Sequence, residues 1–180
     1  MPRLPFPRLT SIGLLLAAPM PLAAQPAPPE RIADEARLAA AVRAAIGDEI
    51  DHGISATKAQ DMEAYMDGVP EDYRIVEEDG SITDRNRLRA LQTQAWALIR
   101  RTNALEIDIT GFTLGCGGAC ADVETDQRWD RQMTGRDGVS EHNVVTTQRH
   151  RERWELRGSR WLQTGIVELG GTVTVNGERY

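Results

Sequence analysis

Apolar residues recur at helical spacing in the first part of the chain. From Glu30 to about His52 they fall three and four residues apart and form one stripe, which predicts an amphipathic helix. Gly53 is a plausible end for this helix, because glycine tolerates the left-handed conformation that follows a helix C-terminus. The segment Thr57-Lys58-Ala59-Gln60 fits a capping box and predicts a second, shorter helix through Met62 to Met66.

A third helix is expected to begin near Thr83 or Asp84. Its apolar positions share one face, with Trp96 at the edge of that face. These positions are Leu88, Leu91, Ala95, Leu98 and Ile99. Residues 72–82, between the second and third helices, predict a small extended hairpin that turns at Asp79-Gly80.

After Thr102 the apolar residues alternate with polar ones, which is typical of strands that bury one face. Such runs cover residues 105–110, 123–133 and 143–169, and Asn176-Gly177 marks the turn of a last short ribbon. Three helices followed by about four long strands indicate an α+β fold. We expect the three N-terminal helices to pack on the concave face of one strongly curved antiparallel sheet.

The segment Asn143 to Leu169 has two unlike faces. Strand alternation puts a charged row on one side, namely Arg149, Arg151, Arg153, Glu155 and Arg157. The other side mixes polar, aliphatic and aromatic residues, namely Thr146, Gln148, His150, Glu152, Trp154 and Leu156. Such a mixture on an inner face is typical of a sheet curved around a wet cavity, so the pattern predicts a pocket.

Gly158-Ser159 suits a two-residue type II′ turn, and this turn sets the expected strand register. The expected pairs are Leu156 with Trp161, Trp154 with Gln163, Glu152 with Gly165 and His150 with Val167. On the outer face, Arg149 is then expected opposite Glu168. Gly165 would leave open space beside Glu152, although a glycine within a strand also marks a bulge or bend.

The first 24 residues predict a cleaved secretory signal peptide. Arg3 and Arg8 precede a short apolar run, which ends in small residues up to Ala24. An uncleaved anchor is the alternative, but the run is too short to span a bilayer. Residues 25–30 form a Pro-rich tether, 31–169 the folded domain and 170–180 a short C-terminal ribbon or tail. We therefore expect a periplasmic or secreted protein without stable membrane insertion after cleavage.

Charge and composition exclude several classes of protein. The 21 basic and 27 acidic residues of the 180-residue chain give a formal charge of −6, which becomes −8 without the two arginines of the signal. An acidic protein of this kind is not expected to bind nucleic acid. With three histidines and no close His/Asp/Glu spacing, no metal is expected. The sequence contains no phosphate-binding loop or nucleophile elbow, and no cofactor is expected.

Cys116 and Cys120 flank the residues Gly-Gly-Ala. In an oxidising compartment, two cysteines on either side of a glycine-rich reversal can approach to disulfide distance, so we expect a structural disulfide. The ring is short, and its stabilisation should fall at the low end of the usual range of about 2–4 kcal/mol. A zinc site would need more ligands, and redox enzymes use the spacing C-x-x-C.

Several local phrases resemble the SnoaL-like group of the nuclear transport factor 2-like superfamily, which includes ketosteroid isomerases and polyketide cyclases. The phrases are Asp61 to Tyr65 with Glu71-Asp72-Tyr73, Glu78-Asp79-Gly80 with Thr83-Asp84-Arg85, and Arg153 to Trp161. The resemblance covers about residues 31–169. It implies a cone-shaped barrel with an internal pocket between the sheet and the helices, often in a homodimer through the outer face of the sheet.

His150 and Glu152 are the sharpest candidates for chemistry. Two residues apart on one strand, they share a face at a separation of about 7 Å, so they could act as an acid/base pair or bind one ligand. Mutual hydrogen bonding inside a polar end of the barrel is the alternative. Asp79 lies where the base of the resembling family can occur, with a solvated turn as the alternative. Further expected ligand contacts are Tyr65, Trp96, Gln127, Trp129, Gln148 and Trp154; for the aromatic residues among them, core packing is the alternative.

Three hypotheses about function follow. In the first, an exported protein binds a small, partly apolar molecule in an internal pocket without converting it. In the second, the protein is an isomerase-like or cyclase-like enzyme that performs acid/base chemistry next to a carbonyl with His150, Glu152 or Asp79. In the third, it is a homodimeric structural or interaction module.

Overall fold

The computed structural model describes residues 29–135 and 137–180; the expected signal peptide and nearly all of the tether lie outside the described residues. The helices are α1 (Pro29–Ala59), α2 (Met62–Asp67) and α3 (Arg85–Leu98), with a short 3-10 helix η1 (Cys116–Gly118). The strands are β1 (Arg74–Val76), β2 (Ile82–Asp84), β3 (Ile99–Gly115), β4 (Cys120–Thr134), β5 (Glu141–Arg157), β6 (Arg160–Val175) and β7 (Glu178–Arg179).

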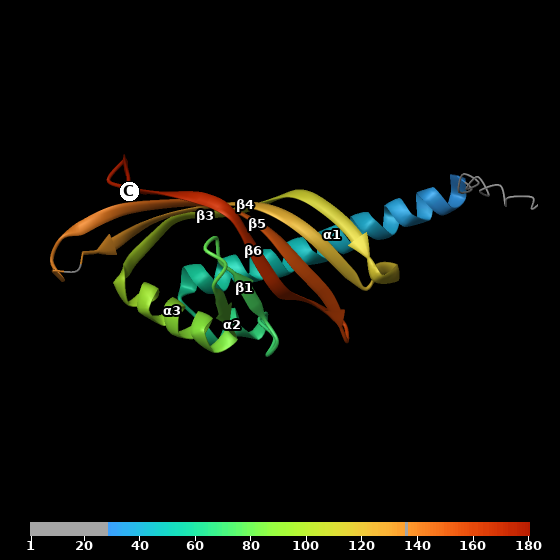
Figure 1. Cartoon of the computed structure of the whole chain (residues 1–180), viewed down its shortest axis with the longest axis horizontal. Helices are drawn as coiled ribbons and strands as arrows, with labels where there is room; N and C mark the ends of the chain where they lie inside the picture. The colour runs from blue at the N-terminus through green and yellow to red at the C-terminus, as the bar shows by residue number, and fades with distance from the viewer. Residues whose placement is uncertain (1–28, 136) are drawn as a thin grey trace, which may run out of the picture.

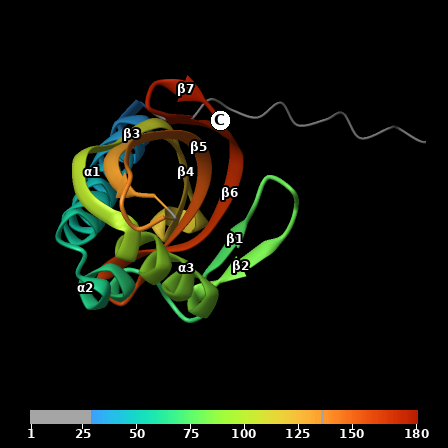
Figure 2. The same ribbon diagram turned by 90° about the vertical axis from the view of Figure 1, so that its left-hand side faces the viewer.

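The strands form one sheet in the order β2-β1-β6-β5-β4-β3, and β7 pairs with β6. This sheet is strongly curved and arches over the three helices (Figure 1), and its curl is visible along the strands in Figure 2. The predicted α+β class, with three helices on one curved sheet, is confirmed. The strand order leaves β2 and β3 as edge strands, so the sheet is open.

The expectation of a purely antiparallel sheet is wrong, because β1 runs parallel to β6. The predicted hairpin of residues 72–82 is present as β1 and β2, which are paired antiparallel. Of the two strands of this hairpin, β1 pairs with a long strand, with Arg74 opposite Gly165 and Val76 opposite Val167. The sheet is therefore mixed, and a short hairpin from the helical half of the chain extends it beside the pocket.

The first helix is longer than expected and continues past Gly53 to Ala59. The left-handed residue that follows the helix is Gln60, with a φ of 53°. Burial explains the difference, because Ala56 and Thr57 are buried and continue the inner face of the helix. The expected capping box at Thr57 is also wrong: Asp61 caps α2 by accepting hydrogen bonds from the backbone N–H groups of residues 63 and 64 at 3.1 Å.

The third helix begins where the sequence predicts, with the Asp84 side chain accepting a hydrogen bond from the backbone N–H of Arg87 at 2.9 Å. Its buried face differs from the predicted one. Leu88 and Trp96 are buried, whereas Leu91 and Leu98 are 42% and 40% exposed. The face toward the core therefore follows an i, i+4, i+8 row through residue 92, and Trp96 lies inside the core rather than at its edge.

The hairpin of β5 and β6 keeps the predicted register only near its turn. Gly158 has a φ of 66° and Ser159 is not left-handed, as a type II′ turn requires. The pairs Leu156 with Trp161 and Trp154 with Gln163 are confirmed.

Beyond those two pairs the predicted register is wrong, because a bulge at Thr164 shifts β6 by one residue. Glu152 faces Ile166 and His150 faces Glu168. Gly165 does not open space beside Glu152. Its missing side chain instead allows β1 to approach, since a Cβ there would lie 3.3 Å from the backbone oxygen of Arg74.

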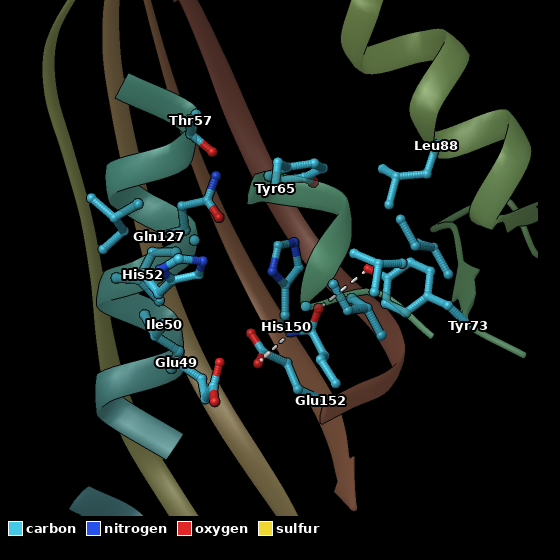
Figure 3. Close-up of a pocket in the computed structure, with 18 of the residues that line it drawn as sticks. Glu49, Ile50, His52, Thr57, Tyr65, Tyr73, Leu88, Gln127, His150 and Glu152 are labelled. Atoms are coloured by element: carbon cyan, nitrogen blue, oxygen red, sulfur yellow. Dashed lines mark hydrogen bonds between the residues drawn. The ribbon is translucent and has the colours of Figure 1, made fainter. Parts of the chain in front are cut away.

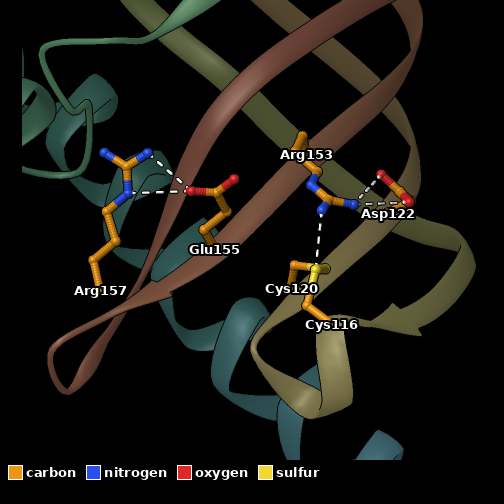
Figure 4. The surroundings of a disulfide bond; sticks show 6 residues. All are labelled: Cys116, Cys120, Asp122, Arg153, Glu155 and Arg157. Carbon is orange, nitrogen blue, oxygen red and sulfur yellow. Dashed lines mark hydrogen bonds and ion pairs between the residues drawn. A yellow bond between two sulfur atoms is a disulfide. The ribbon is translucent and has the colours of Figure 1, made fainter.

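The predicted disulfide is present and joins Cys116 to Cys120 with a Cα–Cα distance of 5.3 Å. It closes the reversal between β3 and β4 (Figure 4). Arg153 of β5 donates hydrogen bonds to both carboxylate oxygens of Asp122 at 3.1 Å and to the sulfur of Cys116 at 3.3 Å. The disulfide is thus tied to the charged outer row of the sheet.

Candidate functional site

A pocket of about 350 Å³ lies between the concave face of the sheet and the three helices. It separates two apolar clusters. One joins α1 to the sheet and contains Ile46, Val123 and Trp154, whereas the other gathers Met66, Tyr73, Leu88 and Val69 around α2 and α3. The pocket walls are mainly apolar side chains of these clusters, with polar groups concentrated on the long strands. The polar residues on the strands are Gln127, Gln148, His150, Glu152, Gln163 and Glu168, and the helices contribute Glu49, His52, Thr57 and Gln92.

The Glu152 carboxylate is buried on β5 and accepts three hydrogen bonds. Its Oε1 accepts from the Thr125 hydroxyl at 2.7 Å, and its Oε2 accepts from Trp154 Nε1 at 2.8 Å and Gln163 Nε2 at 2.7 Å. Short, charge-assisted bonds of this kind hold a side chain in one orientation. Glu152 is thus fixed by partners from β4, β5 and β6, and none of the three donors is His150.

The tyrosine Tyr73 extends this network toward the helices. Its hydroxyl donates to Oε1 of Gln163 at 3.3 Å, so Gln163 connects the phenol to Glu152. Burial raises the pKa of Tyr73 well above its usual value, and the nearby Tyr65 and Glu152 raise it further. Burial also raises the pKa of Tyr65 to about 12. Both phenols are therefore neutral hydrogen-bond donors at physiological pH.

His150 lies in the middle of the pocket, between α1 on one side and Tyr65 and Tyr73 on the other (Figure 3). Its side chain is 7% exposed, and its Nε2 has no hydrogen-bond partner among the described residues. Burial lowers the pKa of His150 below the usual 6.5, although Glu152 and Glu77 partly oppose this effect. The imidazole is therefore neutral at pH 7 and presents an unsatisfied nitrogen to the pocket.

A second group of polar side chains lies next to His150. Glu168 faces it from β6 and accepts a hydrogen bond from Gln148 Nε2 at 3.1 Å. Burial raises the pKa of Glu168, and the nearby carboxyl groups of Glu77 and Glu78 raise it further, while a backbone hydrogen bond at Glu78 opposes them. One wall of the pocket thus holds an imidazole whose pKa is lowered by burial and a carboxyl group whose pKa is raised by burial.

Seven of the nine residues singled out in the sequence for catalysis or ligand contact line this pocket: Tyr65, Gln127, Trp129, Gln148, His150, Glu152 and Trp154. Trp96 does not line it. Its buried ring packs edge-on against the Tyr65 ring, with a centroid distance of 5.7 Å. Asp79 lies in the exposed β1–β2 turn, where its Oδ1 accepts a hydrogen bond from the backbone N–H of Ser81 at 2.8 Å. Hydrogen bonding with Ser81 lowers the pKa of Asp79.

Sequence reasoning did not single out four residues that complete the site: Tyr73, Thr125, Gln163 and Glu168. Strand alternation does place Thr125 and Gln163 on the inner face, so the pattern contained a signal for both. The inward position of Glu168 could not be read from the pattern, because it depends on the bulge at Thr164. Tyr73 occurs in one of the resembling phrases, but its contact with Gln163 spans 90 residues of sequence.

Two further properties concern only residues 29–135 and 137–180. Within these ranges, no group of three or more His, Cys, Asp or Glu side chains is placed to hold a metal ion. No helix in the same part of the chain has the length and apolar character needed to cross a membrane.

Known proteins resemble this chain in fold rather than in sequence. No protein-family model matches the sequence, and no curated protein matches it. Solved structures do match. A candidate scytalone dehydratase from Novosphingobium aromaticivorans superposes with a TM-score of 0.66 at 10% identity, covering 77% of this chain and 90% of that one. A nuclear transport factor 2-like protein from Cytophaga hutchinsonii gives 0.55 at 14% identity, covering 70% and 95%.

This chain has the nuclear transport factor 2-like fold. A hexachlorocyclohexane dehydrochlorinase, LinA type 2, also superposes on it with a TM-score of 0.57 at 15% identity, covering 78% of this chain and 93% of that one. At such low identities the similarity concerns the fold alone. Any conclusion about function must therefore come from the pocket of this nuclear transport factor 2-like chain.

Proposed function

We propose that the protein binds a small, largely apolar molecule in the pocket and that a polar group of this molecule bonds to Nε2 of His150. The observation that carries the proposal is this buried, unpartnered nitrogen inside a mainly apolar cavity. Leaving such a group unsatisfied costs about 1–3 kcal/mol, and a ligand that supplies the missing hydrogen bond recovers this free energy. The volume of about 350 Å³ lies within the range of small-molecule sites.

The remaining polar groups support the same proposal. Glu152 already accepts hydrogen bonds from Thr125, Trp154 and Gln163, so it stabilises the wall behind His150. The apolar walls of α1, α2 and α3 would contact the body of the ligand and contribute most of its binding free energy. His150 would then determine the orientation of the ligand.

A thermal-shift or native mass spectrometry screen against small molecules tests the proposal, repeated with His150→Ala and Glu152→Ala. Trp129 and Trp154 line the pocket, so their fluorescence should report binding directly. The matched control is His142→Ala, because His142 lies at the start of β5, outside the pocket. A hit that binds both pocket variants as tightly as the wild type would place the site elsewhere.

Acid/base catalysis is the second candidate, and the lowered pKa of His150 favours it. A neutral imidazole can act as a general base at pH 7, where a protonated one cannot. Two neighbours carry names of elimination enzymes, a candidate dehydratase and a dehydrochlorinase. In such a step Nε2 would take a proton from carbon, the C–H electron pair would form the double bond, and the leaving group would depart with its own pair. Next to a carbonyl, the same proton abstraction would start an isomerisation or cyclisation.

Proton exchange separates catalysis from simple binding. Once a ligand is known, incubation in D2O should exchange its acidic C–H protons if His150 is a base, as followed by NMR. His150→Gln should abolish this exchange and His142→Gln should leave it unchanged. Tight binding without any exchange would favour the binding protein over the enzyme.

Export and dimerisation belong to the same proposal. We infer that residues 1–24 direct export and are removed, and that residues 25–30 tether the domain; the disulfide between Cys116 and Cys120 supports an oxidising destination. A homodimer would form through the charged outer face, where Arg151 pairs with Glu124 at 3.3 Å. Intact mass of the exported protein tests the cleavage, and a sizing experiment tests the dimer, which a monomeric mass would contradict.

A further inference from the structure

Two carboxyl groups lie near the end of the pocket where β1 runs beside β6: Glu168 lines the pocket, and Glu77 lines the surface hollow next to it. The parallel register pairs Ile75 with Ile166, and both of these side chains line the pocket. Glu168 follows Ile166 by two residues on β6, and Glu77 follows Ile75 by two residues, directly after the end of β1. Continuation of the register therefore places Glu77 and Glu168 beside each other on the same side of the sheet. Glu168 also lines that surface hollow, and the nearby Glu77 carboxyl group helps to raise the pKa of Glu168. Two ionised carboxylates offer each other only acceptors, so a cationic hydrogen-bond donor between them would stabilise the pair.

In the described part of the chain, no basic side chain forms an ion pair with these two carboxyl groups or with the adjoining Glu78. Arg87 and Arg179 line neighbouring surface hollows without forming such a pair. Glu168 receives one neutral donor, the Gln148 amide. Adjacent like charges on one face of a sheet are destabilising, so the pair favours a positively charged partner.

His150 adds an independent sign of a missing partner at the same place. It faces Glu168 across β5 and β6, its side chain is more than nine-tenths buried, and its Nε2 is unpartnered within the described chain. A neutral imidazole that carries its proton on Nδ1 is an acceptor at Nε2. Three potential acceptors, two carboxyl groups and one imidazole nitrogen, thus lie side by side at the edge of an apolar cavity.

We propose that the ligand of the pocket carries a protonated amine, which donates hydrogen bonds to Glu168, Glu77 and Nε2 of His150. This inference rests on the proposed function, because it specifies the polar group of the bound molecule. An ammonium group offers up to three N–H donors, which match the three acceptors in number. When the ammonium binds, its positive charge offsets the charge of the two carboxyl groups, and the apolar part of the ligand lies against the helices.

Matched probes of equal length test the charge requirement. Isothermal titration calorimetry on the purified protein at pH 7 and low salt would compare 4-phenylbutylamine, 4-phenyl-1-butanol and 4-phenylbutyrate. The amine should bind at least about tenfold more tightly than the alcohol, since hydrogen bonds between charged partners are the stronger ones. The carboxylate should bind least.

Variants then locate the charge. Glu168→Gln should weaken amine binding about tenfold and leave alcohol binding unchanged, because it removes charge and little volume. Glu106→Gln is the control, since Glu106 is an exposed acid of β3 and its substitution changes the net charge equally. Glu77→Gln tests the same expectation at the residue that follows β1. It replaces Glu168→Gln if circular dichroism shows that Glu168→Gln does not fold.

The outcomes separate this inference from the proposed function. Equal binding of the amine and the alcohol, or unchanged amine binding in both Glu168→Gln and Glu77→Gln, would overturn the inference and leave an apolar binding pocket. Failure of both the amine and the alcohol to bind would contradict the proposed function together with the inference. An equal loss in Glu106→Gln would show that net charge, rather than this site, attracts the amine.

Discussion

His150 lies directly opposite Glu168 across β5 and β6, on the concave face of the sheet. The pairing exists because β6 bulges at Thr164, which turns the next residues of β6 over by one position. Burial lowers the pKa of His150 and raises that of Glu168. Burial therefore favours the neutral form of each of these two neighbouring groups.

Stability should depend on pH through His150. Its pKa is lowered in the folded protein, so the unfolded chain binds the proton at a higher pH than the folded chain. The free energy of unfolding should consequently fall as pH decreases below the unfolded value of 6.5, until pH passes the folded-state pKa. Urea unfolding of wild type and His150→Gln at pH 7.5 and pH 5 measures this effect. The free energy of unfolding of the wild type, relative to that of His150→Gln, should be smaller at pH 5 than at pH 7.5. A difference of the same size at both pH values would contradict the burial of the imidazole.

The acceptor role of Glu152 predicts unequal effects of two substitutions. Glu152→Ala leaves the donors of Thr125, Trp154 and Gln163 without their acceptor and should lower the free energy of unfolding by at least about 3 kcal/mol. Glu152→Gln keeps one acceptor oxygen, and the Thr125 hydroxyl can turn to accept from the new amide. Its cost should stay within about 1 kcal/mol. Urea unfolding followed by tryptophan fluorescence measures both, and equal losses would argue against the network.

The disulfide between Cys116 and Cys120 should contribute about 2 kcal/mol, at the low end of the usual range because its ring is short. We would replace exposed Cys116 by serine and buried Cys120 by alanine in one double variant. Its melting temperature should match that of wild type under reducing conditions and lie below that of the oxidised protein. A thiol assay on the exported protein provides the check, since two reactive thiols would mean that the bond is not formed.

Two glycine substitutions should change stability in opposite directions. A Cβ at Gly165 would lie 3.3 Å from the backbone oxygen of Arg74, so Gly165→Ala should push β1 away from β6 and cost about 1 kcal/mol. Gly47 lies within α1, and a Cβ there would meet no atom within 4 Å, so Gly47→Ala should add up to about 1 kcal/mol. Thermal unfolding compares the two variants. If both variants were destabilised equally, the approach of β1 to Gly165 would not be the reason for the loss of stability in Gly165→Ala.

Local pattern determined several features of this protein without knowledge of the fold. Side chains alternate along a strand whatever its neighbours are, so the inward positions of His150, Glu152 and Trp154 followed from spacing alone. The turn at Gly158 followed in the same way, because few residues besides glycine adopt a positive φ there. The disulfide also depended on a short local reversal. These predictions were correct because each one rests on chemistry within a few residues.

Tertiary contacts decided the rest. Gly53 could have ended α1, but burial of Ala56 and Thr57 continues the helix across it. The bulge at Thr164 arises where Gly165 accepts the close approach of β1, a strand some 90 residues earlier in the chain. That single inserted residue turns Glu168 inward to His150. A strand's period of two is a property of its sequence, but the position where the period slips depends on which other strand packs against it.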